Sequence, residues 1–137
     1  MKLLTMAATA ALALSLLSTA SLPGEAKEEL LMTTVPASGI PVSEFYKQSV
    51  YDPKENKIGD IDDVLVDKDG RITALVIGVG GFLGVGEKDV AVPFSAVKGT
   101  KKDNKWWLTL NETKDSLKKA VGFKYNKETT SWSVDKK

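Results

Sequence analysis

Two apolar segments joined by a four-residue turn constrain this fold more than any other feature of the sequence. Residues 58–66 and 71–79 are rich in Val and Ile, and residues 67–70 between them read Asp-Lys-Asp-Gly. An Asp-Gly turn between two such segments is a strong hairpin signal, because glycine adopts the positive φ that tight turns require. The sequence therefore predicts two antiparallel strands, with a β-bulge near Asp62 and Asp63, where the apolar alternation is broken.

Shorter segments of the same kind flank this hairpin. The predicted elements are a helical turn or short strand within residues 43–51, a strand at 89–94, a polar turn at 101–105 and a strand at 106–110. Pro93 marks a strand end or an edge, because proline has no backbone N–H to donate. Successive side chains of a strand point to opposite faces, so we expect one of Trp106 and Trp107 in the core and the other at the surface.

One short helix is predicted near the end of the chain. Thr113 can cap a helix that runs through Ala120, with an acidic residue in its first turn and two lysines in its last. Both charges match the helix dipole. Leu117 and Val121 are the residues expected to bury one side of this helix.

The N-terminus has the pattern of a secretory signal peptide. Lys2 precedes an uncharged stretch at residues 3–17, which is shorter than the roughly 20 apolar residues that a membrane span needs. Small residues favour cleavage after Ala26, with Ala20 as the alternative site and an uncleaved anchor as the alternative reading. We therefore expect an exported, periplasmic protein.

The rest of the 137 residues suffices for one domain. The predicted organisation is a signal peptide at residues 1–26, a linker at 27–41, one folded domain at 42–125 and a polar tail at 126–137 that either adds an edge strand or frays. Several short strands with turn signals between them favour a small barrel over a sheet of alternating strands and helices.

Two absences exclude whole classes of chemistry. The chain contains no cysteine and no histidine, so it has no disulfide, no thiolate nucleophile, no Cys/His zinc site and no imidazole-based triad. Without cysteine it also cannot carry a lipoprotein acyl anchor. Its 19 basic and 18 acidic residues nearly balance, which disfavours nucleic-acid binding. Hydrolysis by paired carboxylates is disfavoured because no apolar pocket is predicted that would raise a carboxylate pKa.

The central part of the chain closely resembles the PRC-barrel family, which is named for the H subunit of the photosynthetic reaction centre. The segments that carry the resemblance are VYD at residues 50–52, KIGDIDDVLVD at 57–67, GRITALVIGVGGFLGVGEKDVAVPF at 70–94, WLTL at 107–110 and TKDSLK at 113–118. The resemblance covers roughly residues 42–125. It implies a mostly β fold, a small PRC-type β-barrel of about six strands with one short C-terminal helix.

The resemblance also bears on function. The family's barrels act as docking or regulatory modules, and no catalytic residue set transfers to this chain. A signal peptide stands where the H subunit has a membrane helix, and histidine is absent, so a role in quinone reduction is not implied. Export and the lack of an N-terminal domain separate the chain from the ribosome-maturation factor that shares the barrel.

The glycine-rich stretch at residues 78–88 holds the candidate partner site. Phe82, Leu83 and Val85 could form an exposed apolar tip for a partner. The alternative is structural, with the glycines allowing a tight crossing between strands and the apolar residues packed on the barrel end. A phosphate loop is excluded, because Glu87 stands where that motif needs lysine.

Two further groups of residues were weighed and disfavoured as sites. An acidic group that could attract Ca²⁺ lacks EF-hand spacing and is expected to be a solvated hairpin; its members are Asp60, Asp62, Asp63, Asp67 and Asp69. A basic group beside two tryptophans suggests single-strand binding but is expected to be a solvated turn; its members are Lys101, Lys102 and Lys105.

The sequence thus predicts a non-enzymatic envelope protein that docks on a membrane or periplasmic partner. No catalytic residue, cofactor or metal ligand is predicted. The alternative function is a small-ligand or metal-ion binding barrel in the periplasm, and homo-oligomerisation is left open.

Overall fold

A computed structural model describes residues 30–82 and 86–136, with the backbone alone at residues 81 and 82. The chain divides into two units, Met1–Pro36 and Ala37–Lys137. The described part of the first unit, residues 30–36, contains no helix or strand, in keeping with the predicted linker. No helix among the described residues is long and apolar enough to cross a membrane.

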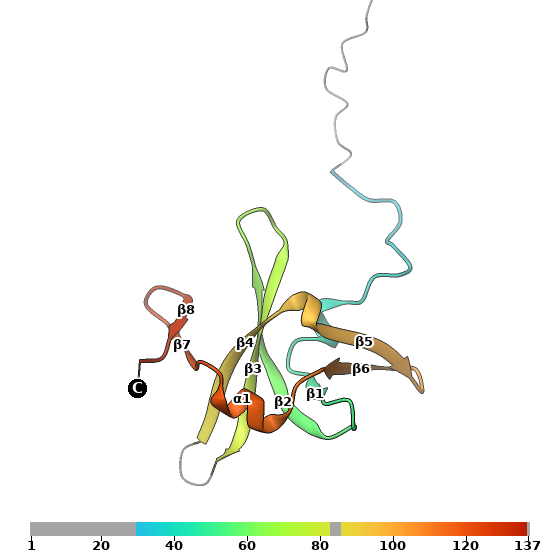
Figure 1. The fold of residues 1–137 in the computed structure, drawn as a ribbon. Coiled ribbons are helices and arrows are strands. Elements are labelled where there is room, and N and C mark those ends of the chain that lie inside the picture. Colours follow the sequence, from blue (N-terminus) through green and yellow to red (C-terminus); the bar gives the residue numbers. More distant parts are fainter. Residues whose placement is uncertain (1–29, 83–85, 137) are drawn as a thin grey trace, which may run out of the picture. The chain divides into compact units, whose positions relative to one another are not determined.

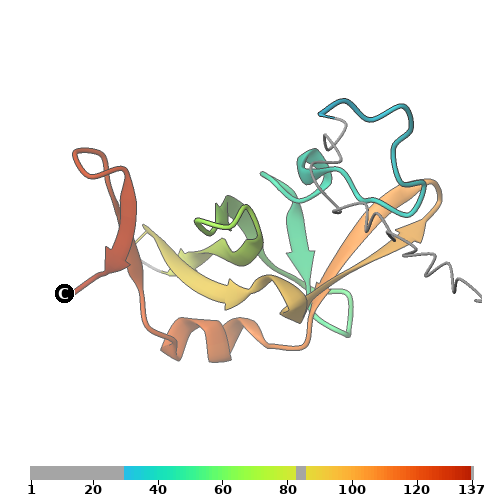
Figure 2. The ribbon, with the colours of Figure 1, turned by 90° about the horizontal axis from the view of Figure 1, so that it is seen from above.

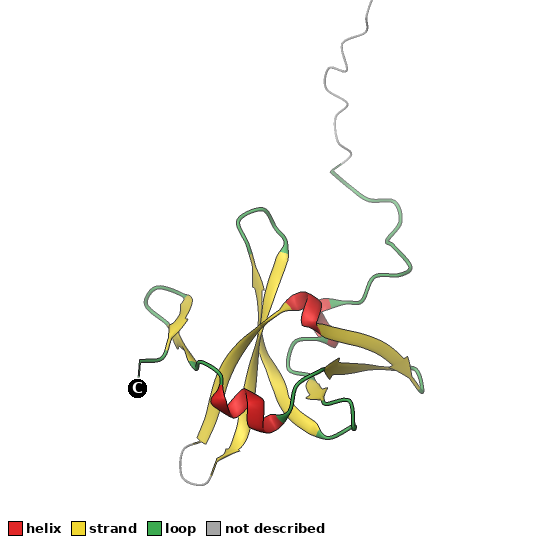
Figure 3. Cartoon of the chain, viewed as in Figure 1, coloured by secondary structure: helices red, strands yellow, loops and turns green. Residues whose placement is uncertain are grey.

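The second unit is built on one sheet of eight strands. Figures 1 and 3 show how these strands are arranged. The strands are β1 (Ser49–Tyr51), β2 (Lys57–Val66), β3 (Ile72–Phe82), β4 (Gly86–Pro93), β5 (Val97–Lys102), β6 (Lys105–Leu110), β7 (Phe123–Asn126) and β8 (Ser131–Val134). The helical elements are η1 (Val42–Glu44), η2 (Phe94–Ala96) and α1 (Lys114–Lys119). The strand order is β5-β6-β1-β2-β3-β4-β7-β8.

The mostly β fold is confirmed, but the count of about six strands is wrong. No separate strand was predicted at β5, and its last two residues were placed in a polar turn at 101–105, whereas the turn is confined to Asp103 and Asn104, both with positive φ. The polar tail adds β8 rather than fraying, and β7 precedes it. The sheet is also not closed, since β5 and β8 are its two edges.

The β2–β3 hairpin is confirmed in detail. The two strands pair antiparallel, and Gly70 in the turn has a φ of 81°. The register shifts between Ile61 and Asp63, so Asp62 is the extra residue of a β-bulge at the predicted place. The bulge determines the position of the Asp62 carboxylate.

One hydrophobic cluster forms the core. Its members are Phe45, Val50, Ile58, Ile61, Leu75, Ile77, Val79, Val90, Val97, Leu108, Leu110 and Leu117. Every strand from β1 to β6 contributes, and α1 lies beside the sheet in Figure 2 and adds Leu117. Apolar burial is therefore concentrated in the segment from η1 to α1, and β7 and β8 contribute no residue to the cluster.

The helix α1 begins as predicted. The Thr113 hydroxyl accepts a hydrogen bond from the Ser116 amide at 3.1 Å, and the Ser116 hydroxyl accepts one from the Thr113 amide at 3.1 Å. Ala120 closes the helix. Val121, expected on its buried side, is 58% exposed, because the chain has already left the helix and turned towards β7.

The expectation for the neighbouring tryptophans is wrong. Both Trp106 and Trp107 are half-buried, and neither joins the core. Leu108 and Leu110 occupy the core face of β6, and Trp106 shares that face at the far end of the strand. The ring of Trp107 points to the other face and stacks on Tyr51.

Candidate functional site: a carboxylate cluster beside an apolar groove

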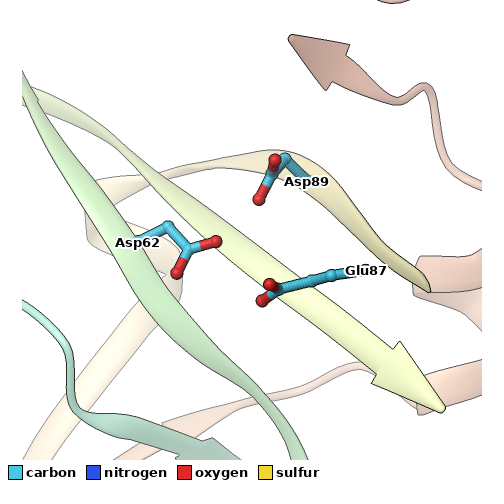
Figure 4. A group of neighbouring side chains, drawn as sticks. All are labelled: Asp62, Glu87 and Asp89. Carbon is cyan, nitrogen blue, oxygen red and sulfur yellow. The ribbon is translucent and has the colours of Figure 1, made fainter. Parts of the chain in front are cut away.

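Three carboxylates converge on one face of the sheet. Asp62 comes from the bulge of β2, and Glu87 and Asp89 are two residues apart on β4. One oxygen of each lies within 4.8 Å of the others. Figure 4 shows the three side chains pointing towards a common centre above β3. We call these residues the carboxylate cluster.

A glycine makes room for this cluster. Gly78 of β3 pairs with Asp60 on one side and with Asp89 on the other. A Cβ atom on Gly78 would lie 1.7 Å from Glu87 Oε1 and 2.4 Å from Asp62 Oδ2. The carboxylates therefore occupy the space that any other residue at position 78 would fill.

The electrostatics of the cluster favour the protonated state. Burial, followed by hydrogen bonding and charge repulsion from Asp62, raises the pKa of Asp89 to about 7. Burial and the charge of Asp62 also raise the pKa of Glu87. The Lys47 ammonium, 3.8 Å from Asp62 Oδ1, opposes these shifts but does not cancel them. Asp89 Oδ1 is buried and has no hydrogen-bond partner among residues 30–82 and 86–136.

The raised pKa of Asp89 contradicts one expectation drawn from the sequence. Hydrolysis by paired carboxylates was disfavoured because no environment was expected to raise a carboxylate pKa, yet the pKa of Asp89 is raised. The three groups face one another, an arrangement that can share a proton or offer three oxygens to a hard cation.

An apolar groove adjoins the cluster. It is a hollow of about 880 Å³ between the first half of β4 and the segment from the end of α1 through β7 to β8. Glu87 and Asp89 line one side, and Val121, Phe123 and Val134 line the other. We call this hollow the β4–β7 groove.

A model of the PRC-barrel domain family matches residues 38–117, which is more than half of the chain. The chain belongs to the PRC-barrel family. A search of curated proteins finds no match. The family match ends within α1, so the PRC-barrel segment supplies the carboxylate cluster, whereas β7, β8 and the far wall of the β4–β7 groove lie beyond it.

The predicted apolar tip of the PRC-barrel lies outside the side chains that the structure describes. Phe82 ends β3, but its side chain, Leu83 and Val85 lie outside the described residues. Gly86, which follows this tip, has a positive φ of 72°, a conformation that glycine adopts readily.

The five aspartates that had been considered together are separated by the fold. Asp60 pairs with Lys57 at 3.0 Å, Asp63 accepts a hydrogen bond from Trp132, and Asp67 accepts backbone hydrogen bonds in the hairpin turn. Only Asp62 joins the carboxylate cluster. Its partners Glu87 and Asp89 were missed, although their alternation after a glycine-rich stretch places them on one face of a strand.

The basic and aromatic residues of the β5–β6 hairpin interact with one another. The Lys102 ammonium lies 4.7 Å from the Trp107 ring centre and also pairs with Glu55, and the Lys101 ammonium lies 5.6 Å from the Trp106 ring centre. The charges of these two lysines are therefore engaged within the chain.

Proposed function

We propose that this PRC-barrel protein is a non-enzymatic binding module of the bacterial envelope that docks on a membrane or periplasmic protein. The observation that carries the proposal is the β4–β7 groove, where Val121 and Val134 are 58% and 51% exposed. Apolar side chains gathered around a hollow mark interaction sites more often than scattered ones do. The volume of the groove lies within the roughly 300–1,000 Å³ of typical binding sites.

The shape of the groove favours an extended segment of a partner. The strand β7 would lie along β4 if their pairing continued, but the two strands pair only at Asp89 and Phe123. Beyond that pair the strands diverge, and the groove opens between them. A partner strand could use the backbone groups of either wall, as in β-strand addition.

The proposal places the protein in the periplasm after removal of its signal peptide. Mass spectrometry of the exported protein tests this placement directly. A mature chain beginning at Lys27, or at Ser21, supports it. An N-terminus at Met1 would contradict cleavage and leave an anchored protein.

Crosslinking in cells tests the docking surface. The tagged, exported protein is crosslinked, purified and compared with the groove variant Val121→Ser/Val134→Ser. We expect one envelope complex that the groove variant loses and that purified components rebuild. Val66→Ser is the matched control, because Val66 is equally exposed but lies at the β2–β3 turn, outside the groove lining.

Two other outcomes would replace the proposal. If the complex is lost in Phe82→Ser/Leu83→Ser and kept in the groove variant, docking occurs at the glycine-rich stretch instead. If no complex is captured and Ca²⁺ or a small ligand raises the melting temperature, the alternative of a ligand-binding barrel gains support.

A further inference from the structure

The two walls of the β4–β7 groove differ in chemistry. Val121, Phe123 and Val134 give one wall its apolar surface, and this wall also carries the oppositely charged pair of residues Lys124 and Asp135. The opposite wall carries Glu87 and Asp89. An occupant that fits both walls combines apolar side chains with a group that a carboxylate can bind. The apolar wall alone would accept any hydrophobic segment, so the carboxylates are what can select a partner.

The acidic wall lies among several carboxyl groups. Glu87 and Asp89 meet Asp62 within 4.8 Å, and Asp60 adds a further like charge to the surroundings of Glu87. The positive charge of Lys47 acts in the opposite direction and lowers the pKa of Asp89. Lys88, which also lines the groove, donates a hydrogen bond from its ammonium to the Lys118 carbonyl at 2.6 Å and is thereby drawn towards α1.

The acidic wall also has unused hydrogen-bonding capacity. Asp89 Oδ1 is buried and accepts no hydrogen bond from the described residues, which is unfavourable for a buried acceptor. A cation that is also a hydrogen-bond donor would do two things at once. It would satisfy this acceptor, and it would reduce the repulsion within the carboxylate cluster.

We propose that the β4–β7 groove receives an extended segment of the protein partner, with an arginine of that segment bound to Glu87 and Asp89. A guanidinium fits better than an ammonium, because its planar fork of donors can reach two carboxylates at once and loses less hydration energy on burial. The inference rests on the docking function proposed above and adds the chemistry of the partner.

Peptide binding to the purified exported protein tests the inference. The probes are N-acetyl-Val-Arg-Val-amide and the same peptide with citrulline, which keeps the shape of arginine but has no charge. Binding is followed by NMR shifts of the amides at residues 86–89 and 123–125. We expect the arginine peptide to bind at least about tenfold more tightly, in line with one charge-assisted bidentate contact.

Two variants test whether Glu87 and Asp89 cause the preference for arginine over citrulline. Glu87→Gln/Asp89→Asn removes both charges without changing the size of the side chains, and it should abolish the preference for arginine over citrulline. Asp69→Asn removes one charge from the exposed β2–β3 turn and should leave the preference unchanged. Because the double variant also relieves repulsion between like charges, it is expected to fold.

The outcomes separate this inference from the docking proposal. Equal affinities for the two peptides, with shifts confined to the groove, would overturn the arginine contact and leave docking intact. An arginine preference that persists in the double variant would overturn it as well. If neither peptide shifts the groove at about 10 mM, and the captured complex survives the groove variant, both ideas fail.

Discussion

The indole nitrogen of Trp132 donates a hydrogen bond of 2.7 Å to Asp63 Oδ2, although 69 positions separate the two residues. This bond ties β8 to β2, two strands that are not neighbours in the sheet. In the described part of the chain, strand pairing joins the C-terminal hairpin to the rest of the sheet at one residue pair, Asp89 and Phe123. The Trp132–Asp63 bond is therefore a main attachment of the hairpin that forms one wall of the groove.

We predict that Trp132→Phe loosens this hairpin without unfolding the domain. The change keeps an aromatic ring against Tyr125 but loses a hydrogen bond to a carboxylate, worth about 1–2 kcal/mol at a partly exposed site. Hydrogen exchange should show the amides of β7 and β8 exchanging roughly tenfold faster, with those of β2 and β3 unchanged. Unaltered exchange of β8 would show that the bond does not hold the hairpin.

We predict that Asp89 makes the protein less stable as pH rises. Its pKa is about 7 in the folded protein and near the ordinary 3.8 when unfolded, so between these values the folded state binds more protons. The contribution of Asp89 to stability should therefore be greatest below pH 4, fall as pH rises towards 7, and then level off. The charged groups that face Asp89 are Asp62 and Glu87, which raise its pKa, and Lys47, which lowers it.

Urea unfolding across this pH range checks the sign. Between pH 4 and 7 the free energy of unfolding of Asp89→Asn should fall less steeply than that of the wild type. Above pH 7 Asp89→Asn should be the more stable protein. Asp103→Asn, an exposed change in the β5–β6 turn, is the control and should follow the wild-type curve. Parallel curves for Asp89→Asn and wild type would refute the raised pKa.

We predict that alanine has different consequences at Gly59 of β2 and at Gly78 of β3. At Gly59 a Cβ would lie 2.6 Å from the Gly78 carbonyl oxygen, which cannot move without shifting the strand. Gly59→Ala should therefore lower the free energy of unfolding by about 1–3 kcal/mol. Gly80→Ala, where a Cβ meets nothing within 4 Å, is the matched control.

Gly78→Ala should act on the carboxylate cluster instead. The new Cβ meets the ends of the Glu87 and Asp62 side chains, which can swing away at little cost. With its neighbours displaced, Asp89 should titrate closer to its ordinary pKa in an NMR titration of the carboxyl carbon. An unchanged pKa would mean that burial alone maintains it.

We predict measurable coupling between Tyr51 and Trp107. Their rings stack with centres 3.7 Å apart and planes 13° from parallel, across the parallel pair of β1 and β6. A double-mutant cycle with leucine at each position should give a coupling of about 0.5–1.5 kcal/mol in urea unfolding. A cycle between Tyr51 and Trp106 should give none, and equal values for the two cycles would contradict a specific stack.

Local sequence patterns predicted the elements whose causes are local. The β2–β3 hairpin follows from an Asp-Gly turn between β-branched residues, and the start of α1 follows from Thr113 as its cap. In both cases a few neighbouring residues satisfy the backbone of the element. The same reasoning failed at Trp106 and Trp107, because alternation predicts which face a side chain takes but not how far the core extends along the strand.

Local sequence patterns did not predict the carboxylate cluster. It needs the register of β3 against both β2 and β4, the one-residue offset introduced by the bulge at Asp62, and the empty space at Gly78. A shift of one residue in either pairing would turn a carboxylate to the opposite face. Register depends on the packing of whole strands, so the sequence pattern does not indicate that Asp62, Glu87 and Asp89 come together.

By itself, the sequence determined the family, the mostly β class, the central hairpin and its bulge, because turn chemistry, apolar periodicity and motif spacing are local properties. The tertiary structure alone decided that the sheet has eight strands and stays open, that Trp132 reaches Asp63, and that Glu87 and Asp89 meet Asp62 beside a groove. These features depend on contacts between residues far apart in the chain, whose geometry is settled only when the strands pack together.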